Sequence, residues 1–139
     1  MKKLLSTLFA FAVIASMTVI ASCGGSSAPS NENVKAAIEK YDKGDNLTES
    51  DWSAVIGYVD AAMDDMLPIY KEINEAQSSG DYSKLESIQG KAEKLNEKYK
   101  YLFEAIAIME NCDDNVEIGK ANEEKAEKLL KKMGDAGVL

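Results

Sequence analysis

The chain has 139 residues, 45% of them hydrophobic, and carries 24 acidic residues against 16 basic ones, a formal charge of −8. It contains neither histidine nor arginine, so the usual side chains for proton transfer near neutral pH and for bidentate anion binding are missing. The acidic balance argues against nucleic acid as a partner, because phosphate binding requires basic patches.

The first residues have the layout of a secretory signal. Met1-Lys2-Lys3 is followed by an apolar run from Leu4 to Ile20, and two small residues precede Cys23. A charged start, an apolar middle and small residues before the cleavage site are typical of exported proteins. Excluding residues 1–22 as a signal peptide leaves 117 residues with 14 lysines and a formal charge of −10, enough for one small domain.

Ile20-Ala21-Ser22-Cys23 matches, at all four positions, the lipobox of bacterial lipoproteins, a family that this chain resembles. The resemblance implies that Cys23 is lipidated and that the membrane is a partner through this lipid anchor. Residues 23–30 are glycine-rich and polar, similar to the start of many Bacteroidetes lipoproteins, and predict a flexible tether. Neither an acidic run nor an aspartate directly follows Cys23, so the resemblance implies the outer membrane of the cell envelope, facing the periplasm.

Two alternatives for this segment are an uncleaved transmembrane helix and a plain secretory signal in which Cys23 is incidental. The apolar run of about 17 residues is short for a hydrocarbon core of roughly 30 Å. Two or three acyl chains on one cysteine hold a protein permanently, whereas a single chain gives only marginal, reversible binding. We therefore favour lipidation.

Hydrophobic periodicity predicts helices throughout residues 31–139. The first is expected over 31–43, with Gly44 as its stop and a single apolar face of Val34, Ala37, Ile38 and Tyr41. The second is expected to follow a capping box of Thr48 and Asp51 and to end at Gly80. Its apolar seam is spaced alternately by four and three residues and consists of Trp52, Ile56, Val59, Met63, Met66, Tyr70 and Ile73.

A third long helix is predicted from Asp81 to about Asn111. Its seam repeats over eight positions, which are Leu85, Ile88, Ala92, Leu95, Tyr99, Leu102, Ile106 and Met109. A loop through 113–115 and a last helix over 120–133 complete the chain.

These elements predict an all-α fold, a short up-down four-helix bundle with a long antiparallel helical hairpin. The two long helices are joined by a short polar turn and must run antiparallel, and both short helices attach at the end opposite that turn. The far part, about 74–98, is therefore expected to project as a two-helix arm. The domain resembles small all-helical lipoproteins of unknown function.

Two acidic regions are candidate binding sites. Asp113, Asn115, Glu117 and Glu124 stand at positions that partly resemble an EF-hand calcium loop. Ile118 occupies the position that requires glycine, however, so we favour a solvated acidic loop and predict no bound metal.

The second region lies between Lys43 and Lys71, where six carboxylates occur without a lysine: Asp45, Glu49, Asp51, Asp60, Asp64 and Asp65. Asp60, Asp64 and Asp65 are candidates for binding a cationic partner, although a solubilising surface is the simpler interpretation. Tyr58 and Tyr101 fall off the apolar seams and are candidates for exposed aromatic contacts with a protein partner.

The sequence offers no set of nucleophile, base and orienting group, so we predict neither enzyme activity nor a cofactor. Cys112 lies on an apolar stretch and is interpreted as a small core residue. The function that we favour is a membrane-anchored, non-enzymatic module that binds protein or contributes to envelope structure. The alternative is a periplasmic immunity-type protein that neutralises a cationic toxin, which small size, acidity and envelope anchoring would suit.

Overall fold

The computed structural model describes residues 31–112 and 116–135. The signal and tether predicted over 1–30 lie outside these ranges. Every regular element within them is helical, which confirms the all-α prediction. The elements are α2 (Asn31–Asp42), α3 (Glu49–Ser79), the short 3₁₀ helix η1 (Tyr82–Lys84), α4 (Leu85–Lys98), α5 (Leu102–Glu110) and α6 (Lys120–Asp135).

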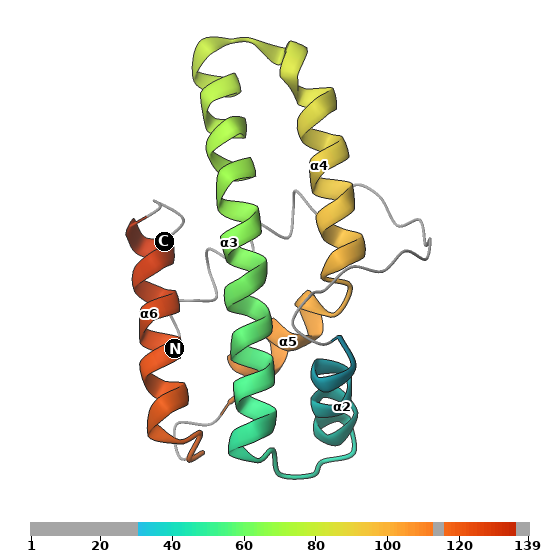
Figure 1. The fold of residues 1–139 in the computed structure, drawn as a ribbon, viewed down its shortest axis with the longest axis vertical. Helices are drawn as coiled ribbons and strands as arrows, with labels where there is room; N and C mark the ends of the chain where they lie inside the picture. The colour runs from blue at the N-terminus through green and yellow to red at the C-terminus, as the bar shows by residue number, and fades with distance from the viewer. Residues whose placement is uncertain (1–30, 113–115, 136–139) are drawn as a thin grey trace.

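Helix α3 is the central element, and it contacts each of the other four α-helices. Figure 1 shows α2, α5 and α6 around the first part of α3, while α4 packs beside its second part. Helix α2 also packs against α5. The second part of α3 and α4 therefore form an antiparallel pair that extends beyond the other helices, and we call this pair, residues 66–98, the arm.

The ends of α3 form as the sequence predicts. The Asp51 N–H donates to Thr48 Oγ1 at 3.3 Å, and the Thr48 N–H donates to Asp51 Oδ2 at 2.9 Å, so both halves of the capping box are present. Gly80 ends the helix with φ of 67°, a left-handed conformation that glycine adopts without steric cost.

The core lies where α2, α5 and α6 surround α3. It is built from side chains that are almost fully buried, among them Val34, Ala37, Trp52, Val55, Ile56, Val59, Met63, Leu102, Ala105, Ile108, Leu129 and Met133. Over 66–81 and 83–98, where the burial of the side chains is described, only Ala76 and Ile88 are buried to this degree. The arm therefore has the narrow apolar seam that its polar sequence predicts.

The single helix predicted over 81–111 is wrong, because the chain turns at residues 99–101 between α4 and α5. Tyr99 and Tyr101 have backbone angles outside the helical region, with φ and ψ of −114° and 50° and of −103° and 14°. Contacts with α3 stabilise the turn: the Tyr99 hydroxyl bonds Asp65 Oδ2 at 2.7 Å, and the Tyr101 N–H donates to the Tyr58 hydroxyl at 3.4 Å. Helix α5 consequently crosses α3 obliquely (Figure 1).

A buried asparagine fixes the start of α6 against the start of α3. The Asn122 side-chain amide donates to the carbonyl oxygens of Glu49, at 2.8 Å, and Ile118, at 2.7 Å. The preceding Gly119 has φ of 85°, and a Cβ there would lie 2.7 Å from the Glu49 side chain. The left-handed conformation therefore favours glycine, and any other residue there would also require the Glu49 side chain to move.

Candidate functional site

The acidic stretch on α3 is paired with lysines from three other helices. Lys40 of α2 contacts Asp51 at 2.8 Å, and Lys98 of α4 contacts Asp65 at 2.6 Å. Lys132 of α6 contacts both Asp60 and Asp64. Four of the six carboxylates are thus held in ion pairs between helices, so the unopposed acidic face that the sequence predicted as a candidate binding surface is a set of internal contacts.

Lys132 lies between two aspartates one turn apart on α3. Its ammonium contacts Asp60 at 2.5 Å and Asp64 at 2.8 Å. Burial disfavours the charged ammonium, but the hydrogen bonds to both carboxylates outweigh it and raise the pKa of Lys132. The lysine thereby offsets the repulsion between two like charges at neighbouring helical positions, which alone would destabilise α3.

Asp65 accepts hydrogen bonds from two successive residues, Lys98 and Tyr99. Hydrogen bonds from Lys98, and then from the Tyr99 hydroxyl, hold the pKa of Asp65 below its usual range. The same bond to Asp65 raises the pKa of Lys98. Asp65 therefore stays ionised and links α3 to both the last residue of α4 and the turn that follows it.

Tyr58 is not an exposed aromatic contact, because its side chain has 0% exposure. Its hydroxyl donates to Asn31 Oδ1 at 2.6 Å and accepts from the Tyr101 N–H, and its ring meets that of Tyr99 edge-on, with centroids 5.4 Å apart. Burial raises the pKa of Tyr58 to about 12. This tyrosine is a core residue that joins the start of α2 to the turn between α4 and α5.

Tyr101 remains a candidate surface aromatic. Its side chain is half-buried, and the ammonium of Lys100 lies 5.0 Å from the centre of its ring. That arrangement is a cation–π contact at the protein surface, with an energy of about 0.5–1 kcal/mol. Within the described residues, no hydrogen bond links the Tyr101 side chain to the paired aspartates, so these candidates do not form one site.

The calcium prediction falls partly outside the described residues, since these exclude Asp113 and Asn115. Glu117 and Glu124, the other two residues of that set, are exposed. Within 31–112 and 116–135, no group of three or more carboxylate or cysteine side chains is placed to hold a metal ion. Cys23, the predicted lipidation site, also lies outside, while Cys112 is partly buried and packs against the core.

Sequence reasoning missed a hollow between α3 and the last turns of α6. Its volume is about 440 Å³, and it is lined by Leu67, Lys71, Lys128, Lys131, Lys132 and Asp135. We call it the lysine hollow. The spacing of the three α6 lysines indicates one face of a helix, but Lys71 precedes them by more than fifty residues, so only the fold brings them together.

The described residues include no helix that is both long enough and apolar enough to cross a membrane. In comparisons with protein-family models, with curated proteins and with solved structures, none matches this chain. The assignment of a function therefore rests on the residues and their geometry.

Proposed function

We propose that this chain is a lipid-anchored lipoprotein of the bacterial cell envelope, held at the outer membrane and facing the periplasm, which acts as a non-enzymatic module that binds protein. The observation that carries the proposal is the lipobox-like Ile20-Ala21-Ser22-Cys23 after a lysine-tipped apolar run. The eight residues from 23 to 30 then join the anchor to the first helix.

The predicted tether meets the folded domain close to the arm, so the lengths of the two can be compared. Asn31 is tied to the carbonyl oxygen of Lys98, at 3.4 Å, and to the Tyr58 hydroxyl, so the tether joins the domain at the base of the arm. An extended tether of this length spans at most about 28 Å. From Met66 to Ser79, the part of α3 in the arm, the helix rises about 20 Å, so the extended tether reaches somewhat farther than the arm.

The shifted pKa values favour a structural interpretation of the ionisable groups. Asp65, Lys98 and Lys132 owe their shifts to contacts between helices, and Tyr58 owes its shift mainly to burial in the core. Catalytic groups are instead expected to converge in a cleft, with a nucleophile next to a base. The same pairing removes the free acidic face that favoured a toxin-neutralising protein, so we do not propose that alternative.

We further propose that the helices form a short four-helix bundle from which the arm presents the binding surface. Leu85 lies at the start of α4, near the tip of the arm, and is 38% exposed. A large apolar side chain at the end of an otherwise polar projection is a suitable anchor for a partner, since interfaces bury such residues at their centre.

A photo-crosslinking residue placed at Leu85 in living cells tests this function. Tyr41 is the matched control, because it is 37% exposed and lies at the end of α2, far from the tip of the arm. We expect a discrete crosslinked product in the membrane fraction from position 85 and none from position 41. Absence of a product at 85, or the same product from both positions, would contradict a binding role for the arm.

A further inference from the structure

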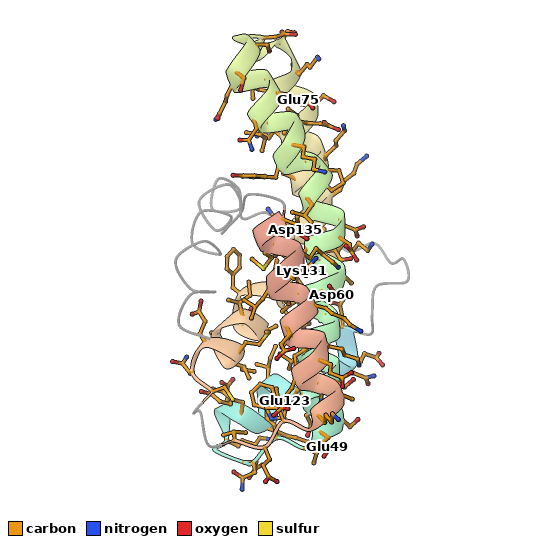
Figure 2. The ribbon with its side chains drawn as sticks, turned by 90° about the vertical axis from the view of Figure 1, so that its left-hand side faces the viewer. Glu49, Asp60, Glu75, Glu123, Lys131 and Asp135 are labelled. Carbon is orange, nitrogen blue, oxygen red and sulfur yellow. The ribbon has the colours of Figure 1, made fainter. Side chains whose placement is uncertain are left out.

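The lysine hollow lies at a step in the molecular surface. Figure 2 shows α6 ending at Asp135 beside α3, which continues past it toward Glu75 in the arm. The hollow is lined by the apolar Leu67 and by lysines from both helices. A segment of another protein that lay in the hollow would contact groups of both α3 and α6.

Two of the four lysines have no acidic partner. Lys132 is held by its two α3 aspartates, and Lys131 contacts Asp135 at 3.2 Å through side chains that are both largely exposed. Such an exposed pair is worth little and opens readily. Within the described residues, no carboxylate lies within 4 Å of Lys71 or Lys128, and both side chains are exposed.

The helix dipole accounts for the lysines of α6 in the hollow but not for Lys71. Lysines in the last turns of α6 are favourable because the C-terminal end of a helix carries a partial negative charge. Lys71 lies two turns before the end of α3, where that effect has faded. Together with Lys128, it gives the hollow two lysines without an ion pair in the described part of a chain with a formal charge of −8.

We propose that the lysine hollow binds an acidic segment of a partner protein, with carboxylates against Lys71, Lys128 and Lys131 and an apolar side chain against Leu67. This inference rests on the proposed protein-binding function and names the chemistry of the partner. A carboxylate segment suits the hollow better than phosphate does. Lysine ammoniums are separate point charges, so each can pair with its own carboxylate along a segment, whereas a phosphate would concentrate its charge beside the negative end of α6.

The test is a titration of the full, anchored chain, purified in a non-ionic detergent, with a short fluorescent peptide of glutamates around a single leucine. The test variant is Lys71→Gln with Lys128→Gln. The control variant is Lys94→Gln with Lys120→Gln, which changes the net charge equally and removes two other exposed lysines that form no ion pair with any described residue. Melting temperatures of both variants verify that the fold is retained.

We expect the peptide to bind the unmodified chain at low salt, and the test variant to bind about tenfold more weakly, as the loss of two exposed charge contacts implies. The control variant is expected to bind within about twofold of the unmodified chain. No saturable binding, or equal weakening in both variants, would overturn the proposal. Displacement of the peptide by inorganic pyrophosphate, with tighter binding of pyrophosphate itself, would assign the hollow to phosphate and also overturn it.

The titration does not depend on the crosslinking experiment at Leu85. If the peptide fails to bind while position 85 crosslinks a partner, the lysine hollow is not a binding site and the proposed function stands. If the peptide binds while position 85 yields no product, the hollow is a binding site and the tip of the arm around Leu85 is not.

Discussion

The substitution Tyr58→Phe gives the sharpest test of how the helices are held together. It removes a single hydroxyl and leaves the aromatic ring in the core. That hydroxyl donates to Asn31 Oδ1 at 2.6 Å and accepts from the Tyr101 N–H at 3.4 Å. Two groups that lie 70 residues apart in the sequence are thereby linked through one atom of α3.

The expected loss of stability comes from the two groups, on Asn31 and Tyr101, that lose the Tyr58 hydroxyl as their hydrogen-bond partner. A net hydrogen bond contributes about 1 kcal/mol, and a buried group left without a partner costs about 1–3 kcal/mol. The bond to Tyr101 is long, so most of the loss comes from Asn31. We expect Tyr58→Phe to lower the free energy of unfolding by about 2 kcal/mol near pH 7, a fall in melting temperature of about 8–16 °C.

The difference in the free energy of unfolding between Tyr58→Phe and the unmodified chain depends on pH, and it decreases in alkaline solution. Burial raises the pKa of Tyr58 to about 12, against about 10 for an exposed tyrosine. Between about pH 10 and 12, the folded chain therefore keeps the Tyr58 proton that the unfolded chain has lost. The contribution of Tyr58 to the free energy of unfolding falls as pH rises through this range. Because phenylalanine does not titrate, the difference in the free energy of unfolding between Tyr58→Phe and the unmodified chain should fall by about 2 kcal/mol between pH 10 and 12, which nearly closes it.

Urea unfolding, followed by circular dichroism over this pH range, measures both effects. Tyr41→Phe is the matched control, because the Tyr41 side chain is 37% exposed and no hydrogen bond of its hydroxyl occurs within the described residues. It should change stability by less than about 0.5 kcal/mol at every pH. Equal effects of the two substitutions, or a gap that stays constant up to pH 12, would refute the role assigned to the Tyr58 hydroxyl.

Three further predictions concern the core, the ion pairs and the acidic loop. Leu102→Ala, at a side chain 6% exposed, should lower the free energy of unfolding in urea by about 2–5 kcal/mol, and Leu85→Ala by about 0.5 kcal/mol or less. Equal losses would mean that the arm is packed against another surface. Asp65→Asn should lower the free energy of unfolding at neutral pH. The difference from the unmodified chain should close below about pH 4 in acid titrations, because the pKa of Asp65 is lowered and protonation of this carboxylate removes its stabilising contribution. Millimolar calcium should leave the melting temperature unchanged, whereas a micromolar site at Asp113 and Asn115, saturated about a thousandfold, would add about 4 kcal/mol.

Local signals in the sequence predicted the helical elements well. The alternating spacing of apolar residues and the capping box of Thr48 and Asp51 placed α3 to within a residue, because both depend on neighbours in the sequence. The turn between α4 and α5 left no such signal. The apolar repeat continues through Tyr99 and Leu102, and the groups that stabilise the turn, on Tyr58 and Asp65, belong to another helix.

The candidate sites were predicted less well because they depend on distant partners. Lys132 is 72 residues from Asp60, and nothing in the local sequence of either shows that they meet. Tyr58 did carry a signal, since Val55, Tyr58 and Ala62 form a second stripe at helical spacing, and all three are fully buried. A stripe beside the main seam indicates that α3 has neighbours on more than one side, and α5 is the helix that crosses there.

The most direct test of the central claim is the substitution Cys23→Ser, with metabolic labelling by a fatty acid and separation of membrane and soluble fractions. The account predicts that the unmodified chain carries the label and stays with the membrane. The Cys23→Ser chain should carry no label and leave the membrane fraction. An unlabelled Cys23→Ser chain that remains in the membrane would contradict the lipid anchor and favour an uncleaved apolar helix at the N-terminus.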